Sequence, residues 1–347
     1  MNRPVVVKLG TSLVVANGRV RRSVLRNRAR EIAELVRAGT PVCVVSSGAI
    51  ALGLSRLGVE RRPKSVPRLQ AASALGQARL QAAWETALAG EGLSAAQILL
   101  TAGDVADRAA YVNVRNALGA LFRLGCVPVV NENDATATDE ITFGDNDALA
   151  AQVAVLARAR LLVLLSEVEG VLTRAPGEPG AELVQEGAAA GSAELGPATA
   201  LGKGGIRSKV LAADMAATAG IPTVIAGGLG RDVLLPLVAG ERRGTHFVPS
   251  ERVPSAFKLW LRLGKSVSGR LILDEGARRA VRDQGASLLA VGVVACEGTF
   301  QAGDGVELVG PDGRPFAKGL VSADVEELRR RPRGVEAVHR DRLVLLA

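Results

Sequence analysis

Two hydrophobic patterns alternate along the first ~230 residues of the chain. Short continuous apolar runs, rich in β-branched residues, predict strands over 4–10, 41–48, 95–101, 127–132, 160–167 and 222–228. Stretches with helical periodicity lie between them and predict helices over about 22–38, 68–89, 108–124, 145–159 and 205–219. Strands that alternate with helices indicate an α/β fold, in which a mainly parallel sheet is sandwiched by helices.

The pattern changes after about residue 250. Residues 253–266 carry Pro, Ser and Gly and are interpreted as a linker that follows a first domain over 1–252. Short apolar runs with turn signals follow, and "GPDGRP" (310–315) has the composition of a tight turn between two strands. With one helix expected at about 275–284, residues 267–347 are predicted to form a small, mostly β domain.

Composition narrows the class of protein. Hydrophobic residues make up 48% and charged residues 22% of the chain, as in an ordinary soluble globular protein. No apolar run reaches the ~18 residues of a membrane helix, and the start of the chain lacks the features of a signal peptide, so we expect a cytoplasmic protein. The three cysteines and two histidines are scattered, which indicates neither a disulfide framework nor a zinc site.

Charge is distributed unevenly. The chain has a net charge of +8, and 36 of its 43 basic residues are Arg, so a Lys at a special position stands out. The segment 131–147, "NENDATATDEITFGDND", instead carries six carboxylates and no Lys or Arg. The segment is either an acidic loop exposed to solvent or a site whose countercharge comes from elsewhere.

Two glycine-containing turns follow predicted strands in the N-terminal part. In "VKLGTS" (7–12), Lys8 precedes the turn at Gly10, whose backbone N–H groups can face an anion. In "VVSSGAIALG" (44–53), Ser47 and Gly48 stand before a predicted helix N-terminus, which is a suitable anion site. The alternatives are a surface Lys beside an ordinary turn and a simple helix N-cap.

Two further motifs lie later in the chain. Asn131 and Asp134 follow a predicted strand, and "FGDND" (143–147) begins a predicted helix, so these polar residues are expected at the carboxyl edge of the sheet. In "GKGGIRSK" (202–209), a Gly-Gly turn precedes a helix that carries Lys209, which is typical of a phosphate cradle or of a flexible loop that caps a helix.

The order and spacing of these motifs resemble the amino acid kinase family, and within it the glutamate 5-kinases. The matching segments are "VVVKLGTS", "VVSSGAIALG", "AASALGQARL", "ILLTAGDVADRAAYVNVRNAL", "PVVNENDATAT", "FGDNDALAA" and "KGGIRSKVLAAD". The C-terminal part resembles the PUA domain that many bacterial members carry, through "LDEGARRAV", "GASLLAVGV", "FQAGDGVEL" and "AVHRDRLVL". The resemblance covers nearly the whole chain.

The resemblance implies transfer of the ATP γ-phosphoryl group, with Mg²⁺, to the side-chain carboxylate of L-glutamate, the first step of proline biosynthesis. The implied catalytic residues are Lys8 and Lys209, with Asp147 orienting both. Substrate binding is implied for Ser47, Gly48, Asn131, Asp134, Asp145 and Asn146. ATP binding is implied for Lys8, Gly10, Ser166, Glu167, Lys203, Gly204, Gly205, Ile206, Arg207, Ser208 and Lys209. No fixed metal site is expected without nucleotide.

The chain departs from the family pattern in two segments, and both lie in the nucleotide region. Ser166–Glu167 stand where the family has Thr-Asp, and Lys203 stands where a Thr is common, which puts the adenine and ribose contacts in doubt. The family further implies a dimer or tetramer and feedback inhibition by proline.

Two alternatives remain open. One is a sister kinase that acts on N-acetylglutamate, aspartate, carbamate or a nucleotide; the "NENDATAT…FGDND" block favours glutamate. The other is RNA binding through the PUA-like domain. Residues 265–347 hold 13 Lys and Arg against 12 Asp and Glu, so the basic excess lies outside this domain, and we do not expect a nucleic-acid partner or a membrane partner.

Overall fold

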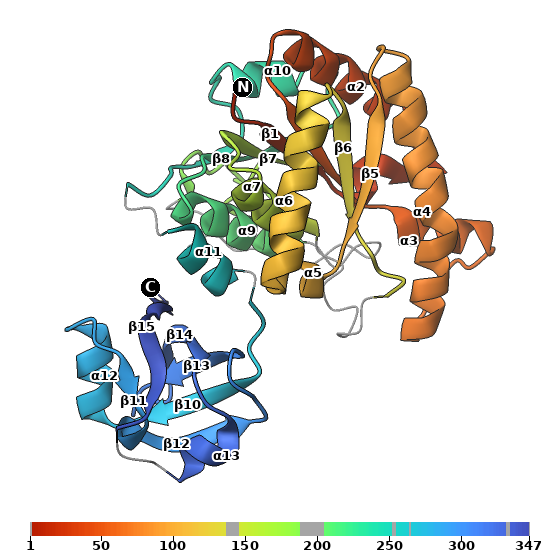
Figure 1. The fold of residues 1–347 in the computed structure, drawn as a ribbon. Coiled ribbons are helices and arrows are strands. Elements are labelled where there is room, and N and C mark those ends of the chain that lie inside the picture. Colours follow the sequence, from red (N-terminus) through yellow and green to blue (C-terminus); the bar gives the residue numbers. More distant parts are fainter. Residues whose placement is uncertain are drawn as a thin grey trace. The chain divides into compact units, whose positions relative to one another are not determined.

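The computed structural model describes residues 2–136, 146–187, 205–251, 255–263, 265–330 and 334–346. The chain divides into two compact units (Figure 1). The larger unit comprises Met1–Thr101 and Tyr111–Val253, and the smaller one comprises Ala102–Ala110 and Pro254–Ala347. None of the helices in the described ranges is long and apolar enough to cross a lipid bilayer.

The larger unit is built on a seven-stranded sheet with the strand order β5-β6-β4-β1-β7-β8-β9. All neighbouring strands are parallel except β8 and β9, which are antiparallel. The strands are β1 (Val5–Leu9), β4 (Val42–Ser46), β5 (Ala95–Leu100), β6 (Val127–Glu132), β7 (Leu161–Ser166), β8 (Thr223–Gly227) and β9 (Thr245–Phe247). The predicted α/β class and all six predicted strands of this region are confirmed.

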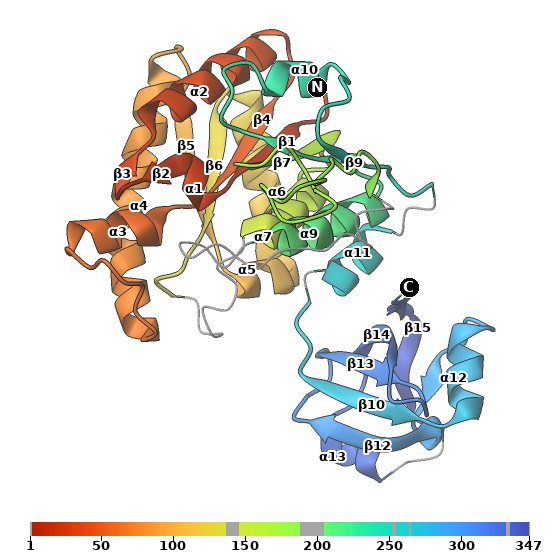
Figure 2. The same ribbon diagram turned by 180° about the vertical axis from the view of Figure 1, so that it is seen from behind.

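Helices cover both faces of this sheet, as Figures 1 and 2 show from opposite sides. One layer contains α2 (Arg22–Arg37), α4 (Val66–Ala89) and α10 (Leu234–Val238), and the other contains α6 (Arg108–Arg123), α7 (Asn146–Leu156) and α9 (Ile206–Thr218). Val5, Val7 and Leu9 of the central strand belong to the core cluster of the first layer. Because side chains alternate along a strand, Lys8 faces the second layer, which contains α7 and α9.

Short elements complete the edge of the sheet where the parallel strands end. These are α1 (Thr11–Val14), the hairpin strands β2 (Val15–Ala16) and β3 (Arg19–Val20), and α3 (Ala49–Arg56). Helices α3 and α4 approach each other very closely at two glycines. A Cβ on Gly53 would lie 1.7 Å from the Ala72 carbonyl oxygen, and one on Gly76 would lie 1.8 Å from that of Ala49. Only glycine permits this spacing.

The smaller unit contains a six-stranded sheet with the order β11-β15-β14-β13-β10-β12. Its core includes Phe300 and the strand residues Leu271, Val306 and Leu308. The "GPDGRP" sequence connects the antiparallel strands β13 and β14, as predicted. The elements are β10 (Gly269–Leu273), α12 (Glu275–Arg282), β11 (Leu288–Leu289), β12 (Val293–Gly298), β13 (Gly305–Val309), β14 (Pro315–Val321), α13 (Val325–Arg329) and β15 (Glu336–Leu345).

Residues 253–266, which the sequence predicts to be a linker, include the eight-residue helix α11 (Ala256–Leu263). Trp260 is buried, and its indole N–H donates to the Val105 carbonyl of α5 (Ala102–Ala106) over 2.9 Å. Lys318 on β14 donates to the carbonyls of Arg262 and Lys265. This helix therefore packs within the smaller unit, while the domain boundaries at 252 and 267 stay a prediction.

Candidate active site

The carboxyl ends of four adjacent parallel strands carry several of the residues that the sequence predicts to be functional. Gly10 follows β1, Ser47 follows β4, Asn131 lies near the end of β6 and Ser166 ends β7. In open α/β sheets, ligands bind beyond this edge. The strand order places β1 between β4 and β7, so that residues distant in sequence come together there.

Asp147 lies between two lysines. Lys8 Nζ is 2.5 Å from Asp147 Oδ1, and Lys209 Nζ is 3.0 Å from Asp147 Oδ2. All three side chains are buried: Asp147 is fully inaccessible, Lys8 is 3% exposed and Lys209 is 5% exposed. Among the described residues, these two lysines share one carboxylate, an arrangement that suits an anionic ligand.

Helix termini position two members of this lysine–aspartate cluster. Asp147 lies in the first turn of α7, where a negative charge interacts favourably with the helix dipole. Lys209 lies at the start of α9, where a positive charge is electrostatically unfavourable. The ion pair with Asp147 compensates for this unfavourable position of Lys209.

A small polar pocket lies at the same edge, with a volume of about 40 Å³ and room for a few water molecules. It brings together five of the six predicted substrate residues, Ser47, Gly48, Asn131, Asp134 and Asn146. Asp145 lies outside the described residues. The pocket is also lined by Thr11, Ile50, Ala51, Arg62 and Glu132.

Asn146 organises one wall of the polar pocket. Its Nδ2 donates to Ser47 Oγ and to Asn131 Oδ1, each over 2.8 Å. Gln77 on α4 accepts a hydrogen bond of 2.7 Å from Asn131 Nδ2. Asn146 Oδ1 is buried and accepts no hydrogen bond from the described part of the chain. An acceptor in this state is suited to a ligand with N–H donors.

Asp134 forms the acidic end of the polar pocket and is 7% exposed. Ser73 on α4 donates to Asp134 Oδ2 over 2.8 Å. Burial raises the pKa of Asp134, and the hydrogen bond from Ser73 and the positive charge of Arg62 offset part of that increase. A bound cation would stabilise the ionised form of this carboxylate.

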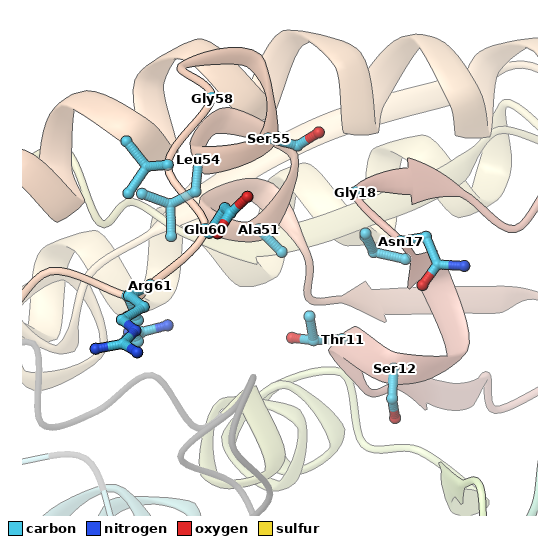
Figure 3. A pocket seen from close by; sticks show the side chains of 13 residues that line it. Thr11, Ser12, Asn17, Gly18, Ala51, Leu54, Ser55, Gly58, Glu60 and Arg61 are labelled. Atoms are coloured by element: carbon cyan, nitrogen blue, oxygen red, sulfur yellow. The ribbon is translucent and has the colours of Figure 1, made fainter.

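A larger cavity of about 740 Å³ shares Thr11, Ala51 and Arg62 with the polar pocket. Figure 3 shows one wall from α3, with Ala51, Leu54 and Ser55, facing Thr11 and Ser12 of α1. The turn between β2 and β3 contributes Asn17 and Gly18, and the segment after α3 contributes Gly58, Val59, Glu60 and Arg61.

The predicted nucleotide residues are partly described. Gly205 precedes α9, and Ile206, Arg207 and Ser208 begin it; Ser208 Oγ lies 3.0 Å from Asp147 Oδ2 and 2.9 Å from the Gly205 carbonyl oxygen. Ser166 ends β7, whereas the next residue, Glu167, forms an ion pair of 3.0 Å with Arg21. Lys203 and Gly204 lie outside the described residues. Within the described ranges, no group of three His, Cys, Asp or Glu residues could hold a metal ion.

Sequence reasoning missed several residues that shape the polar pocket. Ser73 and Gln77 lie four residues apart on α4 and therefore share one helix face. Their segment, "AASALGQARL", contributed to the family resemblance, yet it suggested no role. Arg62 lies in an irregular connection between α3 and α4 and gave no sequence signal.

Comparisons with known proteins agree with this architecture. Residues 3–227 match the model of the amino acid kinase family, and residues 269–341 match that of the PUA domain. The chain is 42% identical to a glutamate 5-kinase of Burkholderia vietnamiensis and 43% identical to one of Burkholderia thailandensis, in each case over 99% of this chain and 98% of the relative.

A solved carbamate kinase from Giardia lamblia, bound to AMP-PNP, has a similar fold. The TM-score is 0.51 at 14% identity, and the match covers 72% of this chain and 99% of the other. The chain belongs to the amino acid kinase family, and within it to the family of the glutamate 5-kinases.

Proposed function

We propose that the protein transfers the γ-phosphoryl group of ATP to the side-chain carboxylate of L-glutamate and so forms L-glutamyl 5-phosphate. The observation that carries this proposal is the lysine–aspartate cluster beside a polar pocket. The pocket presents the Asp134 carboxylate and an amide oxygen of Asn146 that accepts no hydrogen bond from the described residues. Asn146 faces the pocket, and the next residue, Asp147, holds the lysines. The full-length glutamate 5-kinase relatives support this assignment.

Lys8 and Lys209 are the groups that would stabilise the transferring phosphoryl oxygens. Catalysis of phosphoryl transfer depends mainly on positioning and on charge stabilisation. Each preorganised donor of this kind lowers the barrier by about 2.7–4 kcal/mol. Asp147 fixes both ammonium groups by direct ion pairs and is therefore a positioning residue.

The backbone N–H groups at the start of α9 suit the phosphates of ATP, since this end of a helix attracts anions. ATP would bring Mg²⁺, which keeps several waters and binds mainly to phosphate oxygens. The ion would neutralise charge on the phosphates, while the two lysines act from the protein side.

The acceptor needs no general base in this reaction, because a glutamate side chain is already ionised near pH 7. Its ammonium group would fit between the Asp134 carboxylate and Asn146 Oδ1, because both groups are hydrogen-bond acceptors. N-acetylglutamate lacks this ammonium group and would leave the buried Asp134 without an ammonium partner. The oligomeric state and inhibition by proline stay predictions.

A hydroxamate assay tests the proposal. The purified protein is mixed with Mg·ATP, hydroxylamine and either L-glutamate, N-acetylglutamate or L-aspartate, and the acyl hydroxamate is measured. We expect product from L-glutamate at a kcat/KM at least 100-fold higher than from the other two, as a site built for a hydrogen-bonded group discriminates strongly. Product from N-acetylglutamate or aspartate in the absence of product from glutamate would refute the substrate assignment.

A further inference from the structure

We infer that Arg62 binds the α-carboxylate of the acceptor and thereby selects substrates in which this carboxylate is free. The inference rests on the proposed function and assigns a role to a residue that no motif in the sequence identified. Arg62 lies between α3 and α4 and is partly buried. It lines both the polar pocket and the larger cavity.

The charges of the substrate lead to this assignment. Glutamate carries two carboxylates and one ammonium group, and the side-chain carboxylate must reach the phosphoryl group beside the lysines. The α-carboxylate is bonded to the same carbon as the ammonium group and so lies close to Asp134. Among the described residues that line the polar pocket, Arg62 carries the one positive charge, whereas Glu132 and Asp134 are acidic.

Arg62 and Asp134 are close enough to influence each other's ionisation. The positive charge of Arg62 lowers the pKa of Asp134, and Asp134 raises the pKa of Arg62, although burial has the larger effect on each. A substrate head group carries the same pair of charges. Binding can therefore give Asp134 an ammonium partner and Arg62 a carboxylate partner, without leaving a net charge buried.

The position of Arg62 between two cavities supports the same assignment. The polar pocket adjoins a cavity of about 740 Å³, and the two share Thr11, Ala51 and Arg62 among the described lining residues. A guanidinium at this junction can bind a carboxylate through two parallel hydrogen bonds.

The neighbouring arginine provides a matched control. Arg61 is exposed and lines the larger cavity without lining the polar pocket (Figure 3). Arg61→Ala and Arg62→Ala remove the same side chain from adjacent positions. Their difference therefore reports the contact with the acceptor and not the general loss of positive charge.

The experiment compares L-glutamate with L-isoglutamine, in which the α-carboxylate is an amide and the side-chain carboxylate is intact. Hydroxamate formation by the full-length protein gives kcat and KM for each acceptor. We expect Arg62→Ala to raise KM for glutamate about 10-fold to 100-fold, which is the usual effect of losing a hydrogen bond to a charged group. The kcat and the KM for isoglutamine should change little, and Arg62→Lys should restore part of the preference.

The outcomes separate the inference from the proposed function. If the wild-type protein prefers glutamate and both Arg62→Ala and Arg62→Lys keep the full preference over isoglutamine, the inference is wrong and another group holds the α-carboxylate. An equal effect of Arg61→Ala would also overturn it. If the wild-type protein forms no glutamyl hydroxamate, the proposed function itself fails.

Discussion

Two buried ionic clusters in the larger unit show how charge can serve structure or chemistry. Arg28 and Glu31 on α2 are fully buried, and Arg28 Nη2 lies 2.8 Å from Glu31 Oε2. This cluster has one charge of each sign. The lysine–aspartate cluster is equally buried, but it has two positive charges and one negative charge.

The hydrogen-bond partners of the two clusters differ as well. Arg28 also donates to the carbonyls of Gly230 and Arg231, each over 2.8 Å. Glu31 Oε1 accepts from the backbone N–H groups of Val233 and Leu234, each over 2.7 Å. The balanced cluster thus fixes the chain between β8 and α10. The unbalanced cluster lies at the carboxyl edge of the parallel strands. Its described members include one more positive than negative side chain, and a bound anion would offset this difference.

The largest expected effect concerns the balanced cluster. Glu31→Ala leaves Arg28 buried without its carboxylate, so we expect the free energy of unfolding to fall by about 3–5 kcal/mol. Replacing both residues with apolar ones of similar size, Arg28→Met with Glu31→Leu, should cost less than Glu31→Ala alone. Urea denaturation measures both, and kcat of the folded protein should stay near the wild-type value. A large loss of kcat in folded Glu31→Ala protein would contradict a purely structural role.

The next effect concerns the unbalanced cluster. Lys209→Ala should lower kcat by about 100-fold to 1,000-fold, because it removes one preorganised cation from the transition state. Its stability should change little, since Lys8 and Asp147 remain as a balanced pair. Steady-state kinetics measures the loss of kcat, and thermal unfolding measures the change in stability. Lys64→Ala, at an exposed position, is the control for both. A normal kcat in Lys209→Ala would remove Lys209 from the catalytic group.

The smallest effect concerns the pH dependence of acceptor binding. Burial raises the pKa of Asp134 above that of an ordinary aspartate, and its ionised form is the one that pairs with an ammonium group. Glutamate binding is therefore complete above the raised pKa and weakens as pH falls through it. We expect KM for glutamate to rise on acidification at a higher pH than an unperturbed aspartate would give, and by about 10-fold per pH unit below the pKa if binding requires the ionised form.

Asp134→Asn provides the control for that profile. The neutral side chain does not titrate, so its KM should be high and flat over the same pH range. The ionised form of Asp134 is disfavoured in the folded protein, so its contribution to stability increases as pH falls. Asp134 would be identified as the titrating group by two differences between the wild type and Asp134→Asn. KM should rise on acidification in the wild type alone, and the difference in unfolding free energy between the two proteins should change with pH in the opposite direction. A sloping KM in the variant would assign the titration elsewhere.

The sequence predicts the sheet well because its strands are buried on both faces and are therefore continuous apolar runs. It also places Lys8, Asp147 and Lys209 at the ends or starts of regular elements. Their contact depends on β1 lying between β4 and β7, which no local pattern encodes. The sequence does not predict a role for Arg62, because this residue lies in an irregular segment. Its proposed role depends on its proximity to Asp134, which is distant in sequence. Helix α11 was interpreted as part of a linker because Pro and Gly flank a short apolar stretch.

The contact between α3 and α4 at Gly53 and Gly76 bears on which length of acceptor substrate the polar pocket can hold. Helix α3 supplies Ile50 and Ala51 to the wall of the polar pocket, while α4 supplies the side chains that hold Asp134 and Asn131. The distance between two backbones therefore sets how far apart the walls of the pocket stand. Larger residues at these two glycines would push the two helices apart and so widen the pocket. The polar residues that line the pocket would keep their identity. A longer acceptor could then be accommodated by changing two positions that do not contact the acceptor.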